Sequence, residues 1–193
     1  MVILPAVFGS ILTAAVTPFD ADLRVDEPAA AAVFRYLLAN GSDGIVVAGT
    51  TGEASTLTDE EKLALLRIAL HEAGDAPVIA GTGSNDTAHS VHLTRAAAEL
   101  GAAAALVVTP YYNRPPRAGI VAHVAAIAEV GLPVILYNIP GRTTVNMPPD
   151  LLRELAQIPN VAAVKQANPD LDETRTVIDT VPLPVYAGND AMF

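Results

Sequence analysis

The sequence predicts an α/β protein in which the strands of a parallel sheet alternate with helices. Two observations carry this prediction: short apolar runs rich in β-branched residues recur along the whole chain, and stretches with helical periodicity lie between them. Each apolar run is uninterrupted, as expected for strands that are covered on both faces. The runs lie at residues 11–16, 45–48, 78–80, 105–108, 134–137, 161–165 and 185–187.

The expected helices have recognisable ends. The clearest begins after Thr58, because Thr58 and Glu61 are spaced as a capping box ahead of a leucine-rich stretch. Gly74 follows and is suited to a left-handed exit from the helix. Proline, asparagine or glycine residues bracket most of the other helices, which are expected at residues 28–40, 86–100, 118–130, 149–157 and 172–180.

The spacing of the strands, roughly 30 residues from one start to the next, is that of a βα unit and predicts one domain over residues 1–193. Seven strands leave two architectures open: a doubly wound open sheet, or a (βα)8 TIM barrel truncated after the seventh strand. Complete barrels take about 250 residues. In the barrel interpretation we therefore expect an incomplete domain that lacks the eighth strand and the C-terminal helices, with open edges at the first and seventh strands.

The composition excludes several functional classes. The chain has 11 Lys and Arg against 21 Asp and Glu, a formal net charge of −10, which disfavours binding to nucleic acid or anionic lipid. It contains no cysteine, which removes disulfides, thiolate metal ligands and a cysteine nucleophile. The apolar run at residues 2–16 lacks a basic start and is broken by Pro5 and Gly9. We therefore expect no signal peptide, no membrane segment and a cytoplasmic location.

Two residues that end neighbouring strands suggest carbonyl chemistry. Lys165 closes the sixth run, and desolvation there favours the free amine that forms a Schiff base with a carbonyl substrate. The alternative is a lysine that reaches water along its alkyl stem. Tyr137 closes the fifth run, so its phenol is expected near Lys165, as a proton relay if a neighbouring hydroxyl lowers its pKa or otherwise as a packing residue.

Three further segments are suited to anions or to a partner. The run GTTGE at residues 49–53 combines a tight turn with two hydroxyls and several backbone N–H groups, unless it is a plain turn. Arg142 is placed either to hold a substrate carboxylate or to form a surface ion pair. The aromatic loop at residues 111–115 is expected to close over a site or to pack against a second subunit.

The histidines predict no metal site. His89 and His92 share one face of an expected helix, but no third ligand accompanies them. His71 and His123 are expected on helix surfaces.

Four motifs, in this order, resemble the 4-hydroxy-tetrahydrodipicolinate synthases of the pyruvate-dependent class I aldolase superfamily, which also contains N-acetylneuraminate lyase. They are GTTGE at residues 49–53, TPYYNRP at 109–115, YNIPGRT at 137–143 and VK at 164–165. The resemblance covers essentially the whole chain. It implies a (βα)8 barrel, a cytoplasmic lyase, and condensation of pyruvate with L-aspartate 4-semialdehyde through a lysine Schiff base, the first committed step of lysine and diaminopimelate biosynthesis.

The resemblance also implies the catalytic residues. Lys165 would form the imine with pyruvate, and Tyr137 would relay protons. Thr50 and Tyr112 would complete a hydrogen-bonded triad with Tyr137, and Tyr112 would come from a neighbouring subunit. The implied full-length form is a homotetramer, a dimer of dimers, and no metal or organic cofactor is implied.

Substrate binding is implied for three residues: Thr51 for the pyruvate carboxylate, Arg142 for the carboxylate of the semialdehyde, and Gly188. One departure is Gln166, which follows the lysine where many relatives have an acid. A glutamine there can still form hydrogen bonds.

Other departures concern regulation and turnover. Lys62 and His89 stand where lysine-inhibited relatives carry His and Glu, which weighs against lysine feedback. An incomplete barrel can hold all the named residues and still lack turnover. Two alternatives stay open: another aldolase or lyase of the superfamily that acts on a sugar acid, and a non-catalytic anion-binding module.

Overall fold

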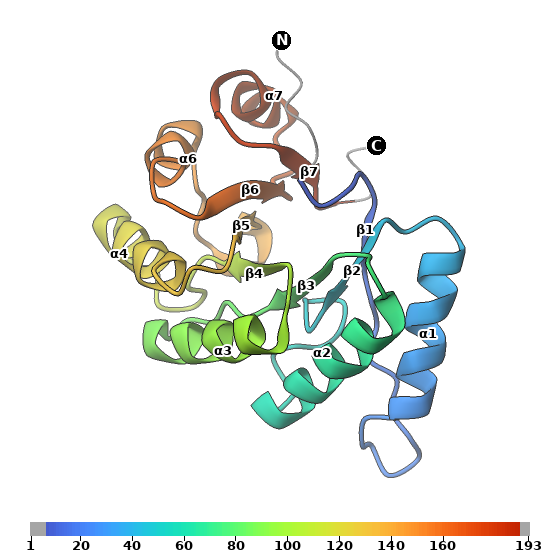
Figure 1. Ribbon diagram of the computed structural model, residues 1–193. Helices are drawn as coiled ribbons and strands as arrows, with labels where there is room; N and C mark the ends of the chain where they lie inside the picture. Colours follow the sequence, from blue (N-terminus) through green and yellow to red (C-terminus); the bar gives the residue numbers. More distant parts are fainter. Residues whose placement is uncertain (1–6, 190–193) are drawn as a thin grey trace.

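The computed structural model describes residues 7–189, and its strands form one curved parallel sheet with the helices on the outer side (Figure 1). Each strand pairs with its neighbour in sequence, in the order β1-β2-β3-β4-β5-β6-β7. A doubly wound sheet reverses its strand order at a switch point. The order is therefore that of the predicted incomplete (βα)8 barrel. The strands are β1 (Leu12–Ala14), β2 (Gly44–Val47), β3 (Val78–Gly81), β4 (Ala104–Val108), β5 (Val134–Asn138), β6 (Val161–Gln166) and β7 (Val185–Ala187).

Six helices match the expected ones to within a few residues. They are α1 (Glu27–Ala39), α2 (Asp59–Ala73), α3 (Thr87–Leu100), α4 (Arg117–Ala128), α6 (Pro149–Leu155) and α7 (Leu171–Thr180). The short helix α5 (Pro140–Thr143) was not expected, because four residues are too few to show a helical period. No helix within residues 7–189 is long and apolar enough to cross a membrane.

The start of α2 confirms the capping box that the sequence predicts. The Thr58 N–H donates to Glu61 Oε2 at 2.8 Å, and the Glu61 N–H donates to Thr58 Oγ1 at 3.2 Å. Gly74 ends the helix with a positive φ of 56°. This helix borders the cavity described below, so the cap fixes one of its walls.

Side chains of the sheet pack into two layers, one on each side. On β5, Val134 and Leu136 belong to the outer layer against the helices, whereas Ile135 and Tyr137 belong to the inner layer inside the curved sheet. Phe8 is also buried in the inner layer. Both faces of the strands are thus covered, which is why their sequences read as continuous apolar runs.

A β-bulge lies at the start of β6. Val134 pairs with Val161, but Ile135 pairs with Ala163, so Ala162 is an extra residue on β6. Ala162 and Ala163 both contact the inner layer. A bulge of this kind shifts the register by one residue and reverses the facing of every side chain that follows.

The two edge strands, β1 and β7, do not form a ladder with each other in the described part of the chain. A side chain links them instead. The Tyr186 hydroxyl on β7 donates to the Gly9 carbonyl at 3.1 Å and accepts from the Phe8 N–H at 3.3 Å.

His123 corrects one expectation, since it is buried at 3% exposure rather than on a helix surface. It lies on α4, and its Nδ1 is 2.8 Å from Thr87 Oγ1 at the start of α3. Burial lowers the pKa of His123 below its ordinary value of 6.5, and the negative charge of Asp86 offsets only part of this effect.

We predict that the free energy of unfolding falls as the pH drops below about 6.5, partly because of His123. The unfolded chain takes up a proton near that pH, whereas the folded chain binds it only at lower pH, so protonation favours unfolding. His123→Asn keeps a polar partner for Thr87 and should flatten this pH dependence in urea unfolding at pH 7.5 and 5.5. His92→Asn, at an exposed position on α3, is the control and should leave the slope unchanged; equal slopes in all three proteins would contradict the prediction.

Candidate active site

Lys165 and Tyr137 lie side by side on the inner face of the sheet. They are direct partners in the β5–β6 ladder, and Lys165 Nζ is 4.4 Å from the centroid of the Tyr137 ring. The bulge produces this arrangement, because it brings both side chains to the same face. An amine and a phenol therefore meet at the carboxyl ends of two parallel strands, where barrel active sites form.

The Tyr137 phenol is 5% exposed, and burial raises its pKa above the ordinary value of 10.0. A side-chain hydrogen bond with Thr50 and the positive charge of Arg142 oppose this rise without cancelling it. The Thr50 hydroxyl thus lowers the pKa of Tyr137, as expected of a neighbouring hydroxyl, but burial outweighs this effect. The phenol consequently stays protonated at neutral pH and can act as a proton donor.

Gly188 packs directly against the stem of Lys165. A Cβ atom at this position would lie 2.9 Å from Lys165 Cγ and 3.1 Å from the Gln166 carbonyl oxygen. The Gly188 N–H also donates to that oxygen at 2.7 Å. The glycine thus leaves the space that the lysine side chain occupies.

The loop at residues 49–53 is held to the first strand–helix connection. Thr17 Oγ1, which is buried, donates to the Gly52 carbonyl at 2.7 Å. Gly81 allows β3 to approach this region, since a Cβ there would lie only 2.0 Å from the Ala48 carbonyl oxygen. These contacts place Thr50 beside Tyr137. Thr51 is exposed on the same turn.

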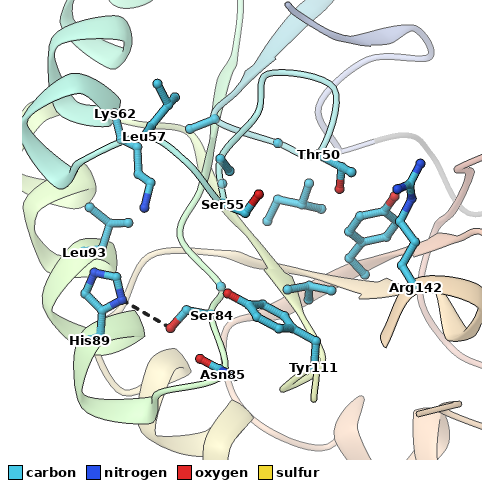
Figure 2. Close-up of a pocket in the computed structure, with 18 of the residues that line it drawn as sticks. Thr50, Ser55, Leu57, Lys62, Ser84, Asn85, His89, Leu93, Tyr111 and Arg142 are labelled. Carbon is cyan, nitrogen blue, oxygen red and sulfur yellow. Dashed lines mark hydrogen bonds between the residues drawn. The ribbon is translucent and has the colours of Figure 1, made fainter. Parts of the chain in front are cut away.

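A cavity of about 580 Å³ opens beside the phenol. Figure 2 shows Thr50 and Arg142 at one end of it and Lys62 and His89 at the other. Thr50, Tyr137 and Arg142 line this cavity. The other predicted site residues, namely Thr51, Tyr112, Lys165 and Gly188, are outside its lining.

The far end of the cavity holds a charged cluster that sequence reasoning did not assemble. Asp59 Oδ2 is 2.8 Å from His89 Nε2, and Asp59 Oδ1 is 3.4 Å from Lys62 Nζ. Burial opposes ionisation of Asp59, but hydrogen bonds and charge from His89 and Lys62 outweigh it, so its pKa lies below 3.8. The acidic first turn of α2 signalled only a helix start. Within residues 7–189, no group of three or more His, Cys, Asp or Glu side chains is arranged to hold a metal ion.

Tyr112 is 89% exposed and does not line this cavity. Its φ of 69° is unusual for a residue other than glycine. The residues that follow anchor the loop: Asn113 Nδ2 donates to the Asn85 carbonyl at 3.0 Å, and Arg114 Nε donates to Thr144 Oγ1 at 3.1 Å. The loop therefore holds Tyr112 outward.

The model of the dihydrodipicolinate synthetase family matches residues 7–193. The chain belongs to this family. A 4-hydroxy-tetrahydrodipicolinate synthase of Mycobacterium leprae (strain Br4923) is 51% identical over 191 residues, and one of Bacillus velezensis is 48% identical over 188 residues. These matches cover 98% and 95% of this chain but 64% and 65% of the relatives, so this family member spans about two thirds of the length of either.

Solved structures of family members have the same fold. Dihydrodipicolinate synthase of Cyanidioschyzon merolae, a structure with lysine bound, matches with a TM-score of 0.93 and 42% identity, over 96% of this chain and 65% of that one. The chloride-inhibited enzyme of Acinetobacter baumannii, complexed with pyruvate, matches with a TM-score of 0.92 and 42% identity, over 95% and 64%.

In this family member, we predict that Thr50→Val raises the pKa of Tyr137 further, because the variant loses the opposing hydrogen bond. Spectrophotometric titration of tyrosinate, with Tyr137→Phe used to assign the signal, measures the shift. Thr51→Val is the control and should leave the titration unchanged. An unaltered or lowered Tyr137 pKa in Thr50→Val would show that this hydrogen bond does not act on the phenol.

We also predict that Gly188→Ala costs about 1–3 kcal/mol of stability, because the added methyl group meets the Lys165 stem and backbone. Gly141→Ala in α5 is the matched control. Nothing lies within 4 Å of its added methyl, so it should be neutral or should stabilise by up to about 1 kcal/mol. Urea unfolding measures both; equal stabilities would contradict the close approach at Gly188.

Proposed function

We propose that this chain performs the chemistry of a 4-hydroxy-tetrahydrodipicolinate synthase, the condensation of pyruvate with L-aspartate 4-semialdehyde through a Schiff base on Lys165. The observation that carries the proposal is the position of Lys165 Nζ, 4.4 Å from the Tyr137 ring centroid at the carboxyl ends of β5 and β6. Membership of the family supports the same reaction.

The reaction needs one amine and a series of proton transfers. Lys165 adds to C2 of pyruvate, and loss of water from the carbinolamine gives the imine. Loss of a C3 proton then gives an enamine, which attacks the aldehyde carbon of the semialdehyde. The amino group of the semialdehyde closes the ring on C2 and releases Lys165. The imine supplies the electron sink, so the proposed reaction uses no metal or organic cofactor.

Tyr137 is suited to serve these proton transfers. Its phenol is protonated at neutral pH and can protonate the departing hydroxyl of the carbinolamine. The hydrogen bond with Thr50 and the charge of Arg142 stabilise the phenolate that remains. In the proposed mechanism, Tyr137 can therefore donate its proton and later take one back.

Both proposed substrates carry a carboxylate, while the chain has a net charge of −10. Local cations must therefore attract them. Arg142 lines the cavity and supplies positive charge there, whereas the charge of Lys62 at the other end is paired with Asp59. We assign the semialdehyde carboxylate to Arg142 and the pyruvate carboxylate to Thr51 and its turn, near Gly188.

Tyr112 fits the role of a group donated to a second copy of the chain. Its anchored loop holds it outward at 89% exposure, away from the cavity of its own chain. In the proposed assembly, a dimer of dimers, Tyr112 of one copy completes the hydrogen-bonded triad with Tyr137 and Thr50 of another.

We predict that pyruvate and borohydride attach a reduced pyruvyl group to Lys165, detected by peptide mass spectrometry. This half-reaction needs no aldehyde, so it tests the proposal on the 193-residue chain itself. Lys165→Arg should remain unmodified, whereas Lys62→Arg, which changes the other lysine of the sequence, should still be modified at Lys165. A folded chain whose Lys165 stays unmodified refutes the imine mechanism and favours a non-catalytic anion-binding module.

The choice of aldehyde requires a separate measurement. Consumption of the enamine, formed with pyruvate in the absence of borohydride, should be faster with aspartate semialdehyde than with longer sugar-derived aldehydes, because Arg142 lies close to the phenol. Preference for the longer aldehyde would assign the chain to sugar-acid chemistry instead.

A further inference from the structure

A pair of buried amides lies directly behind the Lys165–Tyr137 pair, on the outer side of the sheet. Asn138 and Gln166 follow these two residues on β5 and β6 and are partners in the next rung of the ladder. Both are 0% exposed. Asn138 Nδ2 donates to Gln166 Oε1 at 2.9 Å, so a side-chain hydrogen bond joins the strands one residue from the proposed reacting pair.

Asn138 also fixes the chain that follows α5. It accepts from the Met147 N–H at 3.0 Å and donates to Asn146 Oδ1 at 2.9 Å. Asn146 Nδ2 in turn donates to both carboxylate oxygens of Glu173 at 3.0 Å, and Asn168 Nδ2 donates to Glu173 Oε1 at 2.7 Å. The network thereby connects β5 with the first turn of α7, behind the active site rather than inside it.

The bulge at Ala162 makes a fixed register important here. Without it, continuation of the first pairing of β5 and β6 would place Tyr137 opposite Val164 and Asn138 opposite Lys165. Lys165 would then face the outer, helix-covered layer, since a shift of one residue reverses the facing of a strand. The two amides share a rung only in the bulged register, so their hydrogen bond selects the register that brings amine and phenol together.

We propose that Asn138 and Gln166 are positioning residues, which hold Lys165 opposite Tyr137 through their amide hydrogen bond. The inference rests on the proposed function, in which Lys165 is the nucleophile. Both residues are on the far side of the sheet from the amine and act only through the strand register.

The contacts of Gln166 show which atom matters. Its Oε1 accepts from Asn138, whereas its Nε2 is buried and has no hydrogen-bond partner among the described residues. A side chain that keeps an oxygen at this place can keep the contact, and one that lacks it cannot. Gln166→Glu and Gln166→Met, which have similar lengths, separate these two cases.

The test measures the rate at which the borohydride-trapped pyruvyl adduct forms at Lys165 in the 193-residue chain. Gln166→Met should slow formation of the adduct about 10- to 100-fold at saturating pyruvate, as expected for a misplaced reacting group, with little change in the half-saturating pyruvate concentration. Gln166→Glu should stay close to the wild-type rate. Ile127→Ala, in the outer layer on α4, is the destabilised control and should also keep the rate.

A Gln166→Met chain that reacts at the wild-type rate overturns the proposal, and so does a Gln166→Glu chain as slow as Gln166→Met. Slowing in proportion to lost stability, matched by Ile127→Ala, overturns it as well. A wild-type chain that forms no adduct refutes the proposed function instead. Competitive labelling of Lys165 with acetic anhydride, measured across pH, then tests the positioning role. Among the variants, Gln166→Met alone should shift the pH at which labelling of Lys165 is half-maximal. An unchanged midpoint in Gln166→Met overturns the positioning role.

Discussion

The register between β5 and β6 is the constraint on which the rest of the site depends. One extra alanine near the start of β6 determines that Lys165 and Tyr137 share the inner face. Three other features of the site surround that pair: the Thr50 turn beside the phenol, Arg142 close enough to lower the pKa of the phenol, and Gly188 against the lysine stem. Small residues at the bulge suit this role, because two consecutive side chains must fit on the same inner surface.

The electrostatics of the site result from effects that oppose one another. Burial keeps the Tyr137 phenol protonated, while Thr50 and Arg142 favour its ionised form. At the other end of the cavity, burial opposes the charge of Asp59, and His89 with Lys62 restores it. Arg142 and Lys62 thus line a cavity in a strongly acidic chain.

Much of the fold could be predicted, because its signals are local. Continuous apolar runs marked the strands, and the Thr58–Glu61 spacing marked the start of α2 with its actual hydrogen bonds. The bulge had no such signal, since three consecutive small or apolar residues read the same in either register. His123 was misjudged because a histidine at one helical position does not reveal that a second helix covers it.

The site was predictable only in part for the same reason. Motifs after successive strands and a family resemblance indicated Lys165, Tyr137, Thr50 and Arg142, and the structure brings Lys165, Thr50 and Arg142 into the surroundings of the phenol. The cluster of Asp59, Lys62 and His89 joins residues from two helices, and the amide pair behind β5 and β6 depends on a register. Neither follows from spacing along the chain.

The link made by Tyr186 has a mechanical consequence for the edges of the sheet. Neighbouring strands elsewhere are joined by several backbone hydrogen bonds, whereas within residues 7–189 the Tyr186 hydroxyl joins β7 to the segment before β1. A force that pulls β7 away from the segment before β1 therefore acts on the hydrogen bonds of the Tyr186 hydroxyl. If these bonds break, water reaches the part of the inner layer next to Phe8 first.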